Sequence, residues 1–581
     1  MSFSELTYPS EGVTSQQEAT AQGHQCPTKV DRILGIALEH LEVTRELGNA
    51  LLSSYFSNMT AFSLFSREIL DNRLAHTKSI LDAEALLASI FSFAARFVAT
   101  PSAETSDHTG SGTPAASHFA TIASQRLRRA YTESEDLTPS LTLIQAYILL
   151  SYFELTESVR PRSWRILGEC VRISYEIRLH AIDEDFDPDS DISAIGIDLE
   201  QWTMREEYRR AWWAIWEMDV FASTLRRLPT AIDWTQNFTL LPVPDSDWFS
   251  RSYQKSCFLA SDPALRWKDL TKSGNRSAKA WFILINSLMR NTQVLVFSAR
   301  ALALEPSYAE QLSVDLTLVS NALSCTTVSL PDELVYSGEI LNFENDPTDG
   351  TQLQADADKY SIHLMTQLSH VMINNYSVRA RAPWANNTSK ESSHSHGLHS
   401  RASTAEWTKY LNAAEEIVKI VRNSNPRHYR HVNPFLVNTL WFAAAAQCSC
   451  RVFGPTSLTR QHRLAGSNLD LLQLTIDRFI SFWGSTEKLK AKLARLERGL
   501  ATLMQPRDKE HGDASRSTQS DMILQDVNAP SMLDTTGLDL LTANWDPVLG
   551  SEEDVYDENI LHSFAGNFPF GLDDLIAFAN A

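Results

Sequence analysis

The sequence has few cysteines, no apolar run of 18 residues, and no Lys or Arg after Arg516. Its six cysteines are too scattered for a disulfide framework, which fits a reducing intracellular compartment. The one close pair, Cys448 and Cys450, lies in an apolar segment. A structural zinc site needs four soft ligands, so we interpret this pair as two buried thiols. The longest apolar segment, residues 435–447, is too short to cross a membrane and predicts a buried helix.

The common signatures of catalysis are also absent. The sequence contains no G-x-S-x-G, P-loop, G-x-G-x-x-G or H-E-x-x-H motif. Three histidines, His394, His396 and His399, fall in a Ser-rich loop, where we expect them to be solvated rather than to hold a metal. The polar, acidic N-terminus has no secretory signal pattern. We therefore expect a protein that is not an enzyme and has no cofactor, metal or membrane segment.

Charge is distributed unevenly along the chain. The net charge is −20, and residues 517–581 hold twelve Asp and Glu with no Lys or Arg, which leaves −8 for residues 1–516. Excess acid argues against a chain whose main surface binds nucleic acid.

The hydrophobic pattern predicts an all-α chain. Apolar residues recur at three-to-four spacing from Val30 onward, and alternating strands with hairpin turns are absent. We predict a disordered leader over 1–27, a multi-helix regulatory domain over 28–505, and a disordered tail over 506–581. Residues 236–275 look irregular. A final helix over 487–503 repeats Leu at 4, 3, 4, 3 spacing and carries a basic face. A core-packed helix, a dimer contact and a nuclear-import patch all fit it.

One segment, RRAWWAIWEMDVFASTLRRLPTAI from Arg209, concentrates charged and aromatic residues. On a helix, Trp212, Trp216 and Asp219 share one stripe, which predicts a buried carboxylate beside aromatic rings. Such a carboxylate needs donors, and Arg209, Arg210, Arg226 or Arg227 could provide them. The segment indicates a structural hub.

This segment resembles the signature of the fungal-specific transcription factor domain, the helical regulatory region of fungal zinc-cluster regulators. The residues that match the family pattern are Arg209, Arg210, Trp212, Trp213, Asp219, Arg227, Pro229 and Ile232. Further segments, each similar to a family motif, agree in order. Leu51–Leu70 and Leu141–Leu155 are two of them; the others contribute Trp164, Gly168, Arg172, Leu179 and His180, and then Pro242, Asp245 and Trp248. The motif-rich part covers about residues 50–300.

Two of these residues allow a prediction of their own. Gly168 inside a helix costs about 1 kcal/mol against Ala, which suggests that another helix crosses closely there. His180, at a predicted helix end, is interpreted as a partner of the helix dipole rather than a ligand.

The resemblance implies a six-cysteine zinc cluster before the helical domain, yet only Cys26 precedes Cys170. Two interpretations follow: the gene model lacks its first exon, or the protein acts through partners. DNA contact would then be indirect, or made through the missing N-terminal cluster.

The acidic tail mixes carboxylates with large apolar side chains. Such a mixture is typical of disordered activation domains, whose aromatic residues dock into coactivator grooves. A solvating tail, or autoinhibitory docking onto the basic helix 487–503, are the alternatives. The candidate docking residues are Trp545, Phe564, Phe568, Phe570, Leu572, Leu575, Ile576 and Phe578.

Together these features predict a nuclear transcriptional regulator. It would activate a fungal metabolic or secondary-metabolism pathway and recruit coactivators through its tail, and it is a candidate to form a homo- or heterodimer. The alternative is a co-regulator or scaffold that does not bind DNA, or a metabolite-binding protein, recruited by a separate DNA-bound factor.

Overall fold

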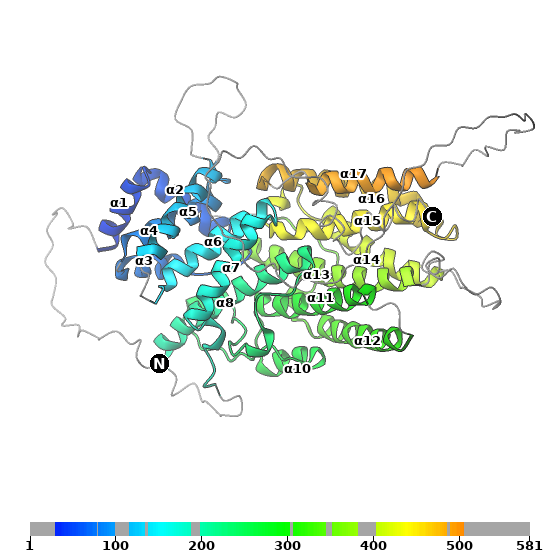
Figure 1. The fold of residues 1–581 in the computed structure, drawn as a ribbon, viewed down its shortest axis with the longest axis horizontal. Helices are drawn as coiled ribbons and strands as arrows, with labels where there is room; N and C mark the ends of the chain where they lie inside the picture. The colour runs from blue at the N-terminus through cyan, green and yellow to red at the C-terminus, as the bar shows by residue number, and fades with distance from the viewer. Residues whose placement is uncertain are drawn as a thin grey trace, which may run out of the picture. The chain divides into compact units, whose positions relative to one another are not determined.

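The computed structural model describes residues 29–77, 79–98, 115–133, 138–186, 198–301, 306–343, 351–380, 403–484 and 488–504. These residues form seventeen α-helices and no strand, with one isolated bridge between Leu341 and Ser424 (Figure 1). The all-α prediction is confirmed. The predicted leader, the whole of the predicted tail with its candidate docking residues, and the three-histidine loop lie outside the described residues. The chain divides into two compact units, residues 1–58 with 63–153, and residues 59–62 with 154–581.

Unit 1 is built around one almost fully buried helix, α4 (Ile80–Ala94). Thirteen of its fifteen residues are buried, and the hydroxyl of Ser79 caps its first turn by accepting from the N–H of Asp82 at 3.2 Å. A helix that is apolar on all sides needs neighbours on all sides. α4 packs against α5, α2 and α1. The helices that begin in this unit are α1 (Lys29–His40), α2 (Arg45–Asn58), α3 (Arg67–His76), α4 (Ile80–Ala94), α5 (Ala116–Glu133) and α6 (Leu141–Glu157).

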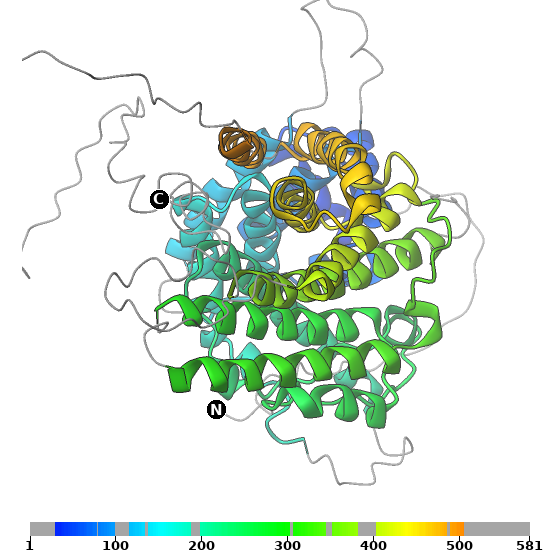
Figure 2. The ribbon, with the colours of Figure 1, turned by 90° about the vertical axis from the view of Figure 1, so that its right-hand side faces the viewer.

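Unit 2 contains a stack of long helices and a shorter group that precedes it. The stack helices are α11 (Ala278–Ala301), α12 (Pro306–Ser329), α13 (Thr351–Ala380), α14 (Thr404–Arg422), α15 (Val437–Phe453), α16 (Thr459–Trp483) and α17 (Lys488–Met504). In this stack, α12 packs on α11, which is followed by α13, α14, α15 and α17 (Figures 1 and 2). The shorter group comprises α7 (Pro161–Glu176), α8 (Leu199–Arg226), α9 (Asp245–Phe249) and α10 (Pro263–Ser273).

The final helix packs within its own chain. Leu493 and Leu496 of α17 are each 3% exposed, and the helix contacts α15 and α16. Arg495 on the opposite face is exposed. Of the three interpretations of this leucine repeat, the structure supports a core-packed amphipathic helix.

The segment predicted to be irregular, residues 236–275, contains two helices. α10 starts at Pro263 after the cap Asp262, whose carboxylate accepts from the N–H of Ala264 at 2.9 Å. It ends before Gly274, which adopts a left-handed φ of 72°. Proline just inside a helix start and glycine just past its end are ordinary helix boundaries. The prediction was therefore wrong for residues 263–273, and a short helix also forms at Asp245–Phe249.

Candidate functional site

The signature segment lies on α8, which is largely buried over three of its turns. Asp198 starts the helix by accepting from the backbone N–H groups of Glu200 and Gln201. Every residue from Arg209 to Val220 is buried. The helix ends at Arg226, and Arg227 then takes a left-handed φ of 54° that turns the chain into the Pro229 loop. A buried stretch that contains charged residues needs internal partners.

An arginine–carboxylate cluster, formed by Asp183, Glu206, Arg209, Arg210 and Asp245, supplies those partners. Arg209 donates to both carboxylate oxygens of Asp183, from Nε at 2.8 Å and from Nη2 at 2.6 Å, and to Glu206 at 3.2 Å. Such bidentate pairs are stronger than neutral hydrogen bonds. Arg209 is 4% exposed and Asp183 is 1% exposed.

Burial and ion pairing shift the pKa values of Arg209 and Glu206 in opposite directions. Burial alone would lower the pKa of Arg209, but the carboxylates of Asp183 and Glu206 outweigh it and raise that pKa. Burial raises the pKa of Glu206, and the positive charges of Arg210 and Arg209 partly offset this increase. Arg209 therefore keeps its charge through its carboxylate partners rather than through water.

Arg210 and Glu206 fasten a non-helical strap, residues 237–244, to α8. Arg210 donates to the carbonyl of Val243 at 2.7 Å and to Glu206 at 3.1 Å, and it also pairs with Asp245. Glu206 in turn accepts from the N–H of Val243 at 3.0 Å. The guanidinium lies 4.2 Å from the ring centroid of Trp248, a favourable cation–π geometry.

The tryptophans of the signature hold the same strap. Trp213 donates its indole N–H to the carbonyl of Leu240 at 2.7 Å, and Trp212 donates to the Asn237 side chain at 3.0 Å. The carbonyl of Pro242 accepts from Asn275 at 3.0 Å. The aromatic pair therefore fills the core with its rings and secures the strap with its nitrogens, as buried indoles require.

Asp219 is buried as predicted, at 1% exposure, but its predicted donors were wrong. It accepts from the backbone N–H groups of Ala231 at 3.1 Å and Ile232 at 2.8 Å, and from the Ser223 hydroxyl at 3.1 Å. The arginines at 209 and 210 turn instead to the carboxylates at 183, 206 and 245. Burial raises the pKa of Asp219, and the backbone donors oppose that increase. Asp219 thus closes the Pro229 loop onto its own helix.

Helix α7 places Trp164, Gly168 and Arg172 on one face, and here a second expectation was wrong. Among the described residues, no other helix crosses closely at Gly168, because a Cβ atom built there has nothing within 4 Å beyond its own helix backbone and chain neighbours. The glycine instead borders a cavity. His180 lies beyond the end of α7, in the turn Leu179–Ala181, with its ring centroid 4.8 Å from that of Tyr175 and 6.1 Å from that of Trp212. Burial lowers its pKa.

Two members of the cluster, Asp183 and Glu206, were not singled out from the sequence. Glu206 lies three and four residues before the two arginines, a spacing that brings side chains together on a helix, so a signal for it was present. Asp183 comes from the turn after α7, and no local pattern connects it to Arg209.

The cluster has the chemistry of a structural hub. Its carboxylates are engaged by guanidinium or backbone donors. Among the described residues, no three His, Cys, Asp or Glu side chains gather as a metal site would need. Cys448 and Cys450 are buried free thiols, whose pKa values burial raises to about 12 and about 11. Within the described parts of the chain, no helix is long and apolar enough to cross a membrane.

Comparison with known proteins gives this geometry a context. Residues 52–324 match the family profile of the fungal specific transcription factor domain, and this range includes the whole hub. The tropolone cluster transcription factor of Talaromyces stipitatus is 30% identical over 131 residues, which are 22% of each chain. The azaphilone cluster-specific transcription factor of Aspergillus niger is 30% identical over 153 residues, 25% of this chain and 31% of that one.

A third relative extends the comparison. The transcription factor tazR of Aspergillus terreus is 32% identical over 107 residues, 18% of this chain and 16% of its own. The chain therefore matches less than a third of the length of each of these three curated relatives. No solved structure matches it.

Proposed function

We propose that the chain is a nuclear regulator of transcription for a fungal secondary-metabolism pathway, because residues 52–324 match the fungal specific transcription factor domain. The observation that carries the proposal is the match of this domain, together with relatives named as regulators of tropolone and azaphilone gene clusters. The arginine–carboxylate cluster supports a regulatory rather than a catalytic role for the helical domain, because its charged side chains are engaged in holding α8 and the strap together.

Activation is assigned to the tail. Residues 517–581 combine twelve acidic residues with six aromatic ones, and acidic repulsion would keep the aromatic side chains available to a coactivator. The test fuses residues 517–581 to a heterologous DNA-binding domain and measures a reporter. Replacing Phe570, Leu575 and Phe578 by Ala should remove most of the activation.

A matched control tests whether any three Ala substitutions in the tail reduce activation. The same number of Ala substitutions at Ser517, Thr518 and Ser520 should leave the reporter unchanged. If the Phe570, Leu575 and Phe578 variant activates as well as the wild-type tail, the tail is a solvating segment and the activation proposal is wrong.

A co-regulator is the second candidate. Residues 1–169 contain one cysteine, Cys26, so these residues do not themselves form a six-cysteine zinc cluster that would contact DNA. The body would then be recruited by a separate DNA-bound factor. A gel-shift titration of the purified chain against promoter DNA from the regulated genes distinguishes the two. Specific binding by the chain alone would overturn the co-regulator proposal.

A further inference from the structure

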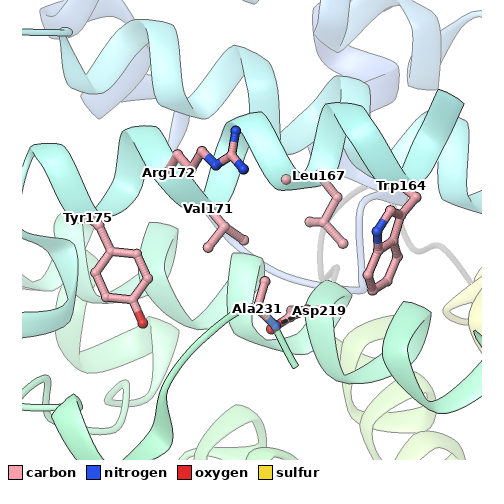
Figure 3. Close-up of a pocket in the computed structure, with 8 residues that line it drawn as sticks. Trp164, Leu167, Val171, Arg172, Tyr175, Asp219 and Ala231 are labelled. Atoms are coloured by element: carbon pink, nitrogen blue, oxygen red, sulfur yellow. Dashed lines mark hydrogen bonds between the residues drawn. The ribbon is translucent and has the colours of Figure 1, made fainter. Parts of the chain in front are cut away.

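A cavity of about 330 Å³ opens between α7 and the Pro229 loop. Trp164, Leu167, Val171 and Tyr175 project from α7 toward Asp219 and Ala231 on the facing side (Figure 3). Asp219 is buried and accepts from the N–H of Ala231 at 3.1 Å, and Ala231 itself is exposed, so the cavity is open to solvent beside Asp219. Its volume falls at the lower end of the range that small-molecule sites occupy, and its wall is mainly apolar, as such sites usually are.

Gly168 keeps this cavity open at a cost to its helix. It lies inside α7, where glycine is about 1 kcal/mol less favourable than Ala. A close helix crossing does not explain the glycine at this position, because a Cβ atom there would enter empty space. A left-handed φ does not explain it either, because the residue has ordinary helical backbone. A larger side chain at 168 would strengthen the helix and would occupy the cavity.

The charges around the cavity favour an anionic group on the Arg172 side, away from Asp219. Asp219 already accepts three hydrogen bonds and interacts with the positive charge of Arg290, so this carboxylate does not require a cation. Arg172 lines the cavity and is exposed. A second guanidinium, that of Arg226, lies 5.3 Å from the ring centroid of Trp164. An anion would be repelled by Asp219 and attracted to these arginines, which fixes the direction of the bound molecule.

We propose that this cavity binds an aromatic, mainly apolar small molecule that carries one acidic group, with its rings against Trp164, Leu167 and Val171 and its acid at Arg172. The inference is independent of the transcriptional role, because binding is a property of the purified chain.

The test uses two fluorescent probes with the full chain: 1-anilinonaphthalene-8-sulfonate and its uncharged analogue N-phenyl-1-naphthylamine. Both should bind saturably, and the sulfonate should bind more tightly. G168L should weaken both by about tenfold or more, because the added side chain fills the site. Its midpoint of denaturation should not fall, because leucine favours the helix more than glycine does.

Matched controls separate the site from general effects. Gly466 of α16 is also a helical glycine with nothing within 4 Å of a built Cβ, so G466L should bind the probes as the wild type does. R172Q should abolish the preference for the sulfonate, while the same change at exposed Arg165 on α7 should not. Unaltered binding by G168L, or no saturable binding by the wild type, would overturn the proposal. Binding that appears only after residues 517–581 are removed would also overturn it, since the chain's own tail would then be the occupant.

Discussion

At the scale of single residues, Asp183 compensates most of the charge of Arg209. It accepts two hydrogen bonds from that guanidinium and one from the backbone N–H of Leu240 at 2.9 Å. Removing one partner of a buried ion pair leaves the other charge without compensation, which typically costs about 3–5 kcal/mol. We expect D183N to lower the free energy of unfolding by that amount, measured by urea denaturation.

The matched control is D185N, at an exposed position two residues away. It should change the free energy of unfolding by less than about 0.5 kcal/mol. Equal stability of the D183N variant and the wild type would show that Glu206 alone compensates Arg209, contrary to this account of the cluster.

A second residue makes the stability depend on pH. His428 is 3% exposed; its Nδ1 lies 2.8 Å from the carbonyl of Asn425, and Nε2 lies 3.3 Å from the Tyr360 hydroxyl. Burial lowers its pKa to about 4, below the unfolded value of about 6.5. Between these values the unfolded chain binds the proton and the folded chain does not, so stability is present above pH 6.5 and falls as the pH decreases toward 4.

The expected contribution of His428 is a loss of about 2 kcal/mol between pH 7 and pH 5. Urea denaturation at both pH values should show a smaller loss for H428Q than for the wild type. The same change at exposed His76 should leave the difference unaltered. An identical pH dependence in H428Q and the wild type would mean that His428 titrates normally in the folded protein.

The sequence predicted which residues are buried better than it predicted their hydrogen-bond partners. The burial of Asp219 and the tryptophans followed from helical spacing, because the stripe that faces a core is a local property. The donors of Asp219 did not follow, because they are backbone N–H groups twelve and thirteen residues later, brought in by the turn at Arg227. Gly168 was interpreted as a packing glycine because sequence alone does not distinguish a close neighbour from an empty space.

At the scale of elements, α17 shows how a leucine repeat is used within one chain. Because Leu493 is buried against its own unit, L493A should lower the free energy of unfolding by about 2–4 kcal/mol, mainly through the cavity it leaves. L474A on α16, whose side chain is 52% exposed, should have little effect. Sedimentation should give the same mass for L493A as for the wild type. A stable L493A variant that dissociates a dimer would instead support the coiled-coil interpretation.

The elements missed from the sequence have a common cause. α10 is bounded by Asp262, Pro263 and Gly274, which are boundary signals, yet only two of its eleven residues, Arg266 and Leu270, are buried. A helix with so narrow a buried face shows little apolar periodicity. α12 was likewise not predicted; its exposed apolar residues, such as Leu318 and Val328, obscure the pattern.

At the scale of the whole molecule, we propose that the chain combines a helical body, in which the buried charges of the arginine–carboxylate cluster are paired internally, with an acidic tail that activates transcription. The body's all-α class could be read from periodicity and the absence of strand patterns. The boundaries proposed for the leader and the tail, and the roles of the tail residues, stay predictions.

The most direct test of this account measures transcripts in the fungus that encodes the chain. Deleting its gene should lower the transcripts of one group of neighbouring biosynthetic genes. Restoring the full chain should recover them, whereas a chain that ends at Arg516 should not, although it accumulates to the same level. Unchanged transcripts in the deletion strain would contradict the regulatory function, and full recovery by the shortened chain would contradict the role of the tail.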